Sequence, residues 1–369
     1  MLLDRVVMDR NIRRIHDRLG AAGVPLRPHL KTTKCIEIAR LMTSGQPGGI
    51  AVSTLAEAER FAAADFQDIV YAVVIAPNKL EHAAALRSSG TALTLLIDNA
   101  DMARAAGAIA TRVGISFPVL IEIDVDGHRS GVFPSSHSLM PVATTINSVP
   151  GLELRGLFAH AGSAYDSANV AEIAEVAEQE RNTMARAART LREAQLPCTE
   201  VSVGSTPTAL TAKSYAGVTE VRAGVFPFND LTQARLGVCT LNDIAITVLC
   251  TVIGYHAPRR RVIVDAGWTA LSQETQLVGS TPIHGRICDI AGQPIDDLVL
   301  TTLNQEHGVI TRLSGRGIDS DELPVGTSLR VLPIHACATA AGYDCYHVMA
   351  EAPEVLEVWP RFGGWKTPN

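Results

Sequence analysis

A lysine stands where an extended segment is expected to give way to a helix. Lys31 follows the apolar stretch Ala21–Leu26 and a proline, which favours extended backbone before it. A threonine suited to cap a helix comes next, ahead of an apolar helical face that starts at Ile36. In α/β proteins ligands bind outside the carboxyl ends of parallel strands, and a lysine held there among apolar neighbours can have a lowered pKa and form a Schiff base. Taken alone, Lys31 also fits an ordinary surface lysine near a helix start.

Other polar residues follow the later strands that we expect in this part of the chain. After the fifth to eighth strands these are Asp124, His128 and Arg129; His160, Gly162 and Tyr165; Gly204, Ser205 and Thr206; and Arg222 and Gly224. Barrel enzymes build their active sites from such loops, and a phosphate commonly binds after strands seven and eight. The N–H groups and hydroxyls of these last two loops suit a phosphate dianion, although Gly-Ser-Thr-Pro also fits an ordinary turn.

A Schiff-base lysine and a phosphate-binding loop in one barrel predict pyridoxal 5′-phosphate, which carries an aldehyde and a phosphate. Nicotinamide and other nucleotide cofactors fit less well, because no Gly-x-Gly-x-x-Gly follows a predicted strand and no Walker motif is present. A class I aldolase without a cofactor would also use a Schiff-base lysine. That lysine usually lies late in the barrel, whereas Lys31 follows the first strand.

A barrel is the element arrangement that would bring these residues together. Short β-branched runs alternate with helical patterns from Val24 to about Gly224, and helices are indicated over Thr54–Ala64, where Glu57 completes a capping box, and over Ser167–Ala194. The expected strands are Val24–Pro28, Ile50–Val52, Ile69–Ile75, Leu93–Ile97, Phe117–Ile123, Leu152–Ala159, Glu200–Val203 and Val218–Arg222. Eight βα units of this kind predict a closed (β/α)8 TIM-type barrel rather than an open sheet.

The pattern changes after about residue 241, where short strands separated by Gly, Pro and Asp replace the alternation with helices. These strands are expected at Ile244–Ile253, Arg261–Val264, Ile283–Asp289, Leu298–Asn304, Ser328–Pro333 and Val355–Val358. We therefore predict a barrel over residues 1–241 and a C-terminal β domain over residues 242–369. The last residues, 363–369, are expected to be loose or docked by Trp365.

Two potential metal ligands lie in the predicted β domain. His335 and Cys337 are two residues apart, so on a strand both side chains would project from the same face. Imidazole and thiolate together suit zinc. Core burial of both side chains is the plainer alternative, because catalytic zinc usually has three protein ligands. Cys345 and His347 repeat the spacing, and we expect them to be strand residues without a ligand role.

Composition limits the classes of partner. The 369 residues are 47% hydrophobic, which is enough for a sizeable core, and the formal net charge is −6 with scattered basic residues. This argues against a nucleic-acid or membrane-surface partner. The seven cysteines are an odd number spread through a long chain, which predicts a reducing cytoplasm, and no signal peptide or transmembrane segment is apparent.

Several motifs spread over nearly the whole chain match one family. They are Arg27–Thr32, Thr54–Ala58, Arg129–Val132, Ala159–Gly162, Gly204–Pro207, Asp265–Gly267, Gln305–Gly308 and His335–Cys337. With these motifs the sequence resembles the fold-type III pyridoxal phosphate enzymes, which have an alanine racemase-like barrel and a β domain. Within them it resembles the D-serine dehydratase and D-threonine aldolase family.

The resemblance implies roles for the barrel residues. Lys31 would be the catalytic Schiff-base lysine, Arg129 would lie near the cofactor ring, and His160 and Tyr165 would line the cofactor pocket. Thr206 and Gly224 would join Gly204 and Ser205 at the phosphate. In this fold type the β domain of one subunit commonly completes the partner's active site, so a homodimer is expected.

The resemblance also implies a catalytic divalent metal at His335 and Cys337. Dehydratases of the family tend to have His-x-Cys, whereas its D-threonine aldolases tend to have His-x-Asp with a harder metal such as manganese. Cys337 therefore favours a dehydratase, and zinc is the expected metal. Manganese and cobalt are the other candidates. Thr33 and Ser163 depart from the family, which usually has histidine at both positions close to the pocket, so the preferred substrate stays open.

The predicted function is a lyase that removes water from a D-3-hydroxy amino acid of the D-serine or D-threonine type, giving a 2-oxo acid and ammonia. The alternative is a D-threonine aldolase, which yields glycine and an aldehyde. A racemase is less favoured, because it needs a base on each face of the substrate and has no use for a metal at a β-hydroxyl. A non-catalytic cofactor carrier is less favoured, because such proteins are barrels alone.

Overall fold

The computed structural model describes residues 1–350 and 354–363, so the expectation for Trp365 lies outside the described residues. The chain forms two compact units. One is Arg14–Gly224, and the other combines Met1–Arg13 with Val225–Phe362.

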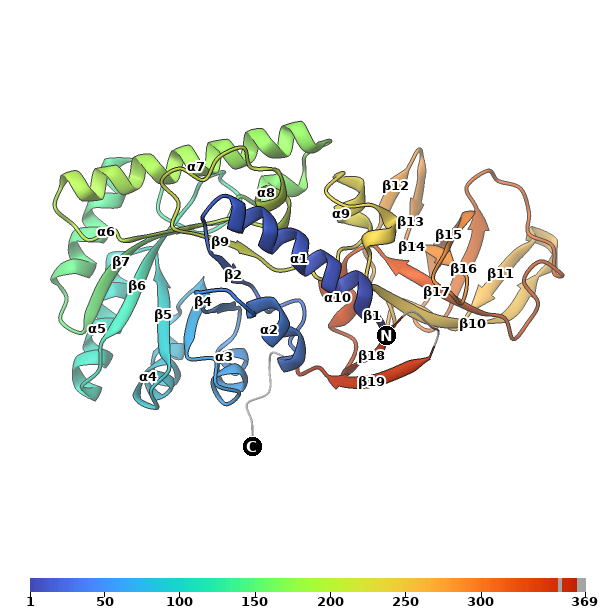
Figure 1. The fold of residues 1–369 in the computed structure, drawn as a ribbon, viewed down its shortest axis with the longest axis horizontal. Coiled ribbons are helices and arrows are strands. Elements are labelled where there is room, and N and C mark those ends of the chain that lie inside the picture. Colours follow the sequence, from blue (N-terminus) through green and yellow to red (C-terminus); the bar gives the residue numbers. More distant parts are fainter. Residues whose placement is uncertain (351–353, 364–369) are drawn as a thin grey trace. The chain divides into compact units, whose positions relative to one another are not determined.

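The first unit is built around eight parallel strands (Figure 1). In sheet order they are β2 (Leu26–Pro28), β9 (Glu220–Ala223), β8 (Glu200–Val203), β7 (Leu152–Ala159), β6 (Phe117–Ile123), β5 (Ala92–Ile97), β4 (Asp68–Val74) and β3 (Ile50–Val52). An isolated parallel bridge between His29 and Ala51 links the two end strands, so the sheet is nearly closed. The eight predicted strands and the (β/α)8 barrel are therefore confirmed.

Helices lie outside these strands in Figure 1. In chain order they are α2 (Ile36–Thr43), α3 (Leu55–Ala62), α4 (Leu80–Ser88), α5 (Ala100–Val113), α6 (Ser136–Ser148), α7 (Val170–Glu193) and α8 (Thr206–Thr211). Strands such as β5 and β6 are buried at nearly every residue, as expected when a parallel sheet is covered on both faces. A buried ion pair joins two neighbouring strands of this sheet, because Arg27 Nε on β2 lies 2.7 Å from Glu220 Oε2 on β9.

Two helix starts differ from expectation. The cap of α2 is Cys35 without a side-chain hydrogen bond, so the predicted threonine cap is wrong. The reason is that Thr32 and Thr33 are fully buried in the turn that precedes the helix. The capping box of α3 is displaced by one residue: Thr54 Oγ1 accepts the N–H of Glu57 (3.1 Å), but the Glu57 carboxylate accepts the N–H of Ser53 (2.8 Å).

The second unit is dominated by a mainly antiparallel sheet of nine strands. In sheet order these are β11 (Arg261–Val264), β16 (Gly308–Arg312), β15 (Pro294–Leu303), β14 (Gly285–Cys288), β17 (Ser328–Pro333), β10 (Ile246–His256), β1 (Leu2–Asp4), β18 (Cys345–Met349) and β19 (Val355–Pro360). β10 also pairs with β11, which closes six of the strands into a ring around an apolar core. A hairpin of β12 (Gln276–Val278) and β13 (Thr281–Ile283) is separate from the sheet. Each predicted strand region of the β domain contains a strand.

The units divide between Gly224 and Val225, whereas we predicted a boundary after residue 241. The N-terminus also belongs to the second unit, because β1 pairs antiparallel with β10 and parallel with β18. The chain then enters α1 (Arg5–Ala21), where the amide of Asn11 donates to the carbonyl oxygens of Pro227 (3.1 Å) and Asp243 (2.7 Å). These contacts join segments that are far apart in sequence. A single boundary at one residue cannot describe a unit made of two such segments.

All seven cysteines are free thiols. Among the described residues, no helix has the length and apolar character needed to cross a bilayer.

Candidate active site

Lys31 lies in the turn that follows β2, at the carboxyl end of the barrel strands. The residues before it are held by both neighbouring strands: the N–H of His29 donates to the carbonyl oxygen of Ala223 (2.8 Å), and that of Leu30 to Ala51 (2.9 Å). The N–H of Lys31 donates to His29 Nδ1 (3.3 Å), and its side chain is exposed. The structure therefore holds the Lys31 backbone at the carboxyl end of the barrel strands, with the side chain exposed there.

His160 follows β7 at the same end of the barrel. Its Nδ1 lies 3.1 Å from the carbonyl oxygen of Gly204, and because a carbonyl only accepts, Nδ1 carries the proton. Its ring centroid is 6.5 Å from that of Tyr165, which ends the short η2 turn (Gly162–Tyr165). Burial lowers the pKa of His160 to about 3, and the charge of Arg129 acts in the same direction. The imidazole is thus neutral at physiological pH and can contact a planar ring.

Electrostatic interactions show which side chains face this mouth together. After burial, the charges of Lys31 and Arg222 lower the pKa of His29 well below its usual value. The charges of Arg129, Lys31 and Arg222 likewise lower the pKa of His160. The structure therefore brings the predicted residues Lys31, Arg129 and His160 within electrostatic reach of one another. The lysine and arginine charges that lower the pKa values of His29 and His160 would favour an anionic ligand beside these two histidines.

Arg222, which the sequence placed near the eighth strand without a role, is a buried residue of β9. Its guanidinium carbon is 3.4 Å from the centroid of the Phe158 ring, and it donates to Ser202 Oγ (2.5 Å) and to the carbonyl oxygen of Ala159. Burial lowers the pKa of Arg222 to about 10, so it stays charged at neutral pH. Among its neighbours is Glu122 on β6, whose pKa burial raises to about 7. A sequence window around Arg222 carries no sign of this network, because its partners come from other strands.

The loops after β8 and β9 contain two glycines in close contact with backbone. A Cβ on Gly204, whose φ is +115°, would lie 2.8 Å from the carbonyl oxygen of Arg222. A Cβ on Gly224 would lie 2.8 Å from that of His29. Both loops therefore depend on glycine for their path along the barrel mouth.

Two of the N–H groups that we assigned to a phosphate have partners within the chain. The N–H of Gly204 donates to Glu180 Oε1 (3.2 Å), and that of Ser205 donates to Thr208 Oγ1 (2.9 Å). Ser205 Oγ also accepts the N–H of Thr208 (3.3 Å) and so caps α8. Gly204 and Ser205 thus shape the loop through internal bonds, and a direct N–H contact from either to a phosphate would require these bonds to be exchanged.

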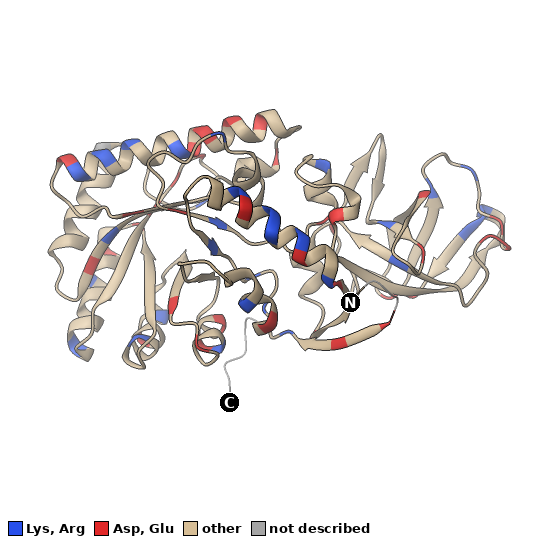
Figure 2. Cartoon of the chain, in the orientation of Figure 1, with Lys and Arg blue, Asp and Glu red and all other residues tan. Residues whose placement is uncertain are grey.

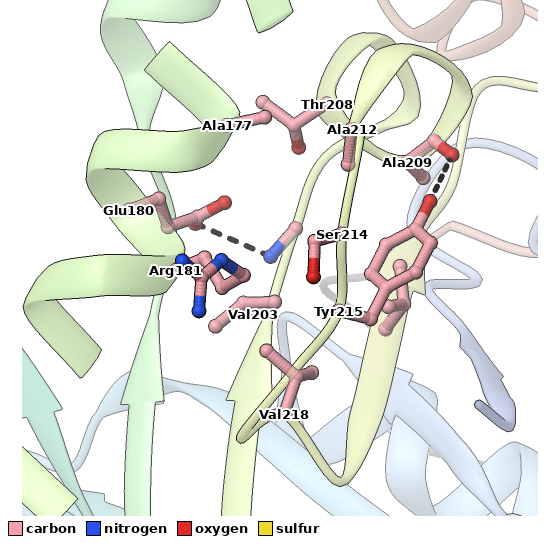
Figure 3. Close-up of a pocket in the computed structure, with 12 residues that line it drawn as sticks. Ala177, Glu180, Arg181, Val203, Thr208, Ala209, Ala212, Ser214, Tyr215 and Val218 are labelled. Atoms are coloured by element: carbon pink, nitrogen blue, oxygen red, sulfur yellow. Dashed lines mark hydrogen bonds between the residues drawn. The ribbon is translucent and has the colours of Figure 1, made fainter. Parts of the chain in front are cut away.

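Glu180 on α7 is a further residue that sequence reasoning missed. Charged residues of both signs line α7 (Figure 2), but Glu180 is only 2% exposed. Its Oε1 accepts the N–H groups of Ala161 (3.0 Å) and Gly204 (3.2 Å), so one carboxylate joins the loops after β7 and β8. In Figure 3 the Glu180 side chain points from α7 toward the other residues drawn. Burial raises its pKa to about 7.

The space around this carboxylate is small. The cavity drawn in Figure 3 has a volume of about 10 Å³, room for no more than about one water molecule. Glu180 is therefore a packed support beneath the loops and does not line an open ligand pocket. A signal existed in the sequence, because Glu180 continues the apolar helical stripe of Ile173, Ala177 and Met184.

His335 and Cys337 lie at the start of helix α10 (Ala336–Ala340), so their predicted placement on a strand is wrong. The buried carboxylate of Asp230 accepts the N–H of Ala336 (2.8 Å) and so turns the chain into the helix. The His335 and Cys337 side chains nevertheless form a hydrogen bond with each other. Burial would lower the pKa of His335, but hydrogen bonds to Cys337 and Glu274 raise it to about 11.

Glu274 is the carboxylate beside this pair. Both of its carboxylate oxygens lie 3.0 Å from His335 Nδ1. Among the described residues, no group of three or more His, Cys, Asp and Glu side chains is arranged to hold a metal ion. His335 and Cys337 would therefore bind a metal as a nitrogen and sulfur pair, with other positions left to water or substrate.

The remaining predicted positions are structurally ordinary. Cys345 and His347 lie on β18 as expected, with 3.8 Å between Sγ and Nε2. Thr33 is buried and its hydroxyl donates to the carbonyl oxygen of Leu30 (3.5 Å). The N–H of Ser163 donates to Asp126 Oδ2 (2.9 Å), in the loop that carries Arg129.

Comparisons with known proteins agree with this architecture. Residues 3–230 match the alanine racemase N-terminal domain, and residues 245–349 match the serine dehydratase domain. The chain is 44% identical to the D-threo-3-hydroxyaspartate dehydratase of Delftia sp. (strain HT23), over 98% of this chain and 96% of that protein. It is 30% identical to the D-serine dehydratase of Dictyostelium discoideum (96% and 94%) and 29% identical to the D-threonine aldolase of Arthrobacter sp. (97% and 90%).

The solved structure of the Delftia dehydratase superposes with a TM-score of 0.95, covering 99% of this chain and 97% of that one. Two of its solved variants replace a histidine and a cysteine that are two positions apart, and the cysteine variant is a metal-free form. The named relatives are dehydratases and aldolases, which are lyases. The chain therefore belongs to the alanine racemase-like, fold-type III family of pyridoxal phosphate-dependent lyases, in the group that carries a serine dehydratase domain.

Proposed function

We propose that this protein is a pyridoxal phosphate- and divalent metal-dependent dehydratase, which converts a D-3-hydroxy amino acid to a 2-oxo acid and ammonia. The observation that carries the proposal is the Lys31 amine at the barrel mouth, among the cations Arg129 and Arg222 and the neutral ring of His160. The 44% identical relative named as a dehydratase of D-threo-3-hydroxyaspartate supports this reaction and adds a dicarboxylic substrate to the D-serine and D-threonine type.

The barrel residues fit the cofactor. Lys31 would hold its aldehyde, His160 and Tyr165 would contact its ring, and Arg129 would lie near that ring. The loops around its phosphate would be formed by Gly204, Ser205, Thr206 and Gly224. At Gly204 and Gly224 a Cβ would clash with neighbouring backbone. The cationic mouth would balance the charge of the phosphate dianion.

The donor set of His335 and Cys337 fits a divalent metal, and zinc is the ion that we propose. When bound, pyridoxal phosphate supplies an electron-accepting ring for the substrate amine, and the metal supplies a Lewis acid for a hydroxyl group. Lys31 would also take the α-proton as a general base. His160 stays neutral because of its burial, so it holds its position by donating from Nδ1 to Gly204 and does not compete for that proton.

Product analysis tests the proposal. The protein would be incubated with pyridoxal phosphate, zinc and a panel of D- and L-configured 3-hydroxy amino acids that includes serine, threonine and 3-hydroxyaspartate. We expect 2-oxo acid and ammonia in equal amounts from D-substrates only. Turnover of L-substrates, or D-substrate consumption without 2-oxo acid, would refute the dehydratase.

A D-threonine aldolase is the second candidate, and the aldolase relative from Arthrobacter sp. favours it. The same assay separates the two, because an aldolase releases glycine and an aldehyde. Cys337 supports the dehydratase, since aldolases of the family tend to have aspartate at this position.

We also propose that the protein works as a homodimer in the cytoplasm on a small-molecule substrate, without a nucleic-acid or membrane partner. The seven free thiols support a reducing compartment. Sedimentation of the cofactor-loaded protein at several concentrations tests the dimer, and a monomer with full activity would refute it.

A further inference from the structure

We propose that Glu274 is a positioning residue of the metal centre. Its carboxylate would hold the His335 imidazole by Nδ1 and so direct the other ring nitrogen, Nε2, to the metal. The inference rests on the proposed metal site at His335 and Cys337, and it adds a group that would set the affinity of that site.

The contact between Glu274 and His335 has the geometry of a ligand-orienting pair. Both carboxylate oxygens lie 3.0 Å from Nδ1. An ionised carboxylate only accepts, so Nδ1 is the protonated nitrogen and Nε2 is the ligand atom that remains. Histidines that bind metals usually donate their other N–H to a carboxylate or carbonyl, which fixes the ring and increases its basicity.

Glu274 is held in place by its own backbone. It lies 61 residues before His335, ahead of β12. Its N–H donates to Ser272 Oγ (3.3 Å), and its carbonyl oxygen lies 3.1 Å from Nδ1 of His284. The carboxylate is therefore presented from an anchored segment, as a positioning role requires.

The backbone of the ligand pair is anchored from another side. Asp230 is 1% exposed, and its two carboxylate oxygens accept the N–H groups of Ala336 (2.8 Å) and Gln233 (2.9 Å). The peptide between His335 and Cys337 is thus fixed before any metal binds. The His335 imidazole can still rotate about its side-chain bonds, and the Glu274 carboxylate restricts this rotation.

A surface ion pair is the competing interpretation, because the Glu274 and His335 side chains are 48% and 39% exposed. Such pairs contribute little to folding stability. The two interpretations therefore differ in what they predict for metal affinity, and thermal stability does not separate them.

The test is zinc affinity, measured by competition with a chromophoric chelator on the cofactor-loaded protein. We expect Glu274→Ala to raise the zinc Kd by about 10- to 100-fold. Glu274→Gln should give a smaller increase, because the amide oxygen still accepts from Nδ1 but carries no charge. The control is Glu322→Ala, since Glu322 is an exposed glutamate of the same unit that pairs with Arg312.

Absorbance of the cobalt-substituted protein gives the second readout. We expect its visible spectrum to be unchanged in Glu274→Gln, since the ligands stay the same. Zinc affinity within twofold of wild type in both Glu274 variants would overturn the inference. A changed cobalt spectrum in Glu274→Gln would also overturn it, because it would indicate that Glu274 binds the metal directly. Equal zinc binding by wild type and His335→Ala would instead refute the proposed metal site, and the inference with it.

Discussion

Lys31 is the residue that the proposed reaction needs twice, once to hold the cofactor and once to take the α-proton. Its amine is exposed at the barrel mouth, while the residues around it are fixed by β3 and β9. We expect Lys31→Ala to lose the near-visible absorbance of lysine-bound cofactor and at least about 10²-fold in kcat, the smallest effect typical of a general base. Absorbance titration and steady-state kinetics measure the two losses.

The matched control is Lys213→Ala, because Lys213 is an exposed lysine of the same unit. It should keep both the absorbance band and the rate. An unchanged band in Lys31→Ala would show that another lysine holds the cofactor, and the scheme would fail.

The buried residue Glu122 should make the folding stability depend on pH. Burial raises its pKa from 4.5 in the ordinary case to about 7 in the folded protein. The folded state therefore binds the proton more tightly than the unfolded state, so this group's contribution to stability is complete below pH 4.5 and is lost as the pH rises to about 7. At about 1.4 kcal/mol for each pH unit in this window, the loss is at most about 3.5 kcal/mol.

Glu122→Gln removes this titration while keeping the shape of the side chain. We expect the free energy of unfolding of the variant, relative to wild type, to increase between pH 5 and pH 8. Urea denaturation at a series of pH values measures it. A constant difference across this range would contradict the raised pKa.

At the level of elements, Glu180 connects an outer helix to two active-site loops. Glu180→Ala would leave the N–H groups of Ala161 and Gly204 without their acceptor, and each such loss typically costs about 1–3 kcal/mol. We expect the Kd for pyridoxal phosphate to rise at least about 10-fold, the equivalent of about 1.4 kcal/mol. A titration of the apoprotein, followed by cofactor absorbance, measures the change.

Glu180→Gln should retain nearly normal affinity, because one carboxamide oxygen can accept both bonds. Glu178→Ala is the control, since Glu178 lies on the exposed face of the same helix and pairs with Arg181. If Glu180→Ala binds the cofactor as well as the control does, the carboxylate does not support the loops.

The sequence predicted the elements well wherever a local pattern determined them. The barrel strands were recognisable because parallel strands buried on both faces are short apolar runs. The errors lie where distant residues decide the local structure. Asp230 turns His335 and Cys337 into a helix, and β1 is a strand because β10 and β18 pair with it.

The same reasoning applies to the candidate site. Lys31, His160 and the glycine loops could be predicted because their positions after strands place them at one end of a barrel. The roles of Arg222, Glu180 and Glu274 could not, because each acts through a partner on another element. Glu180 left a trace in the sequence, as a charged residue within an apolar helical stripe.

At the scale of the whole chain, the two proposed ligand groups come from different compact units. The cofactor residues, from Lys31 to Gly224, belong to Arg14–Gly224, and His335 and Cys337 belong to the unit with Val225–Phe362. Each set also has its own supporting carboxylate, Glu180 for the loops and, as we infer, Glu274 for the metal. Loading of the cofactor and loading of the metal should therefore be separable.

Removal of the metal tests this separation. After treatment with a chelator, we expect the absorbance of lysine-bound cofactor to persist, because none of its proposed contacts comes from His335 or Cys337. Dehydration should fall by at least about 10²-fold, since hydroxide is a poor leaving group and a Lewis acid typically supplies several kcal/mol. Zinc should restore the rate without a change in cofactor content. Loss of the cofactor together with the metal would show that the two sites depend on each other, and an unchanged rate in the metal-free protein would exclude the metal from the reaction.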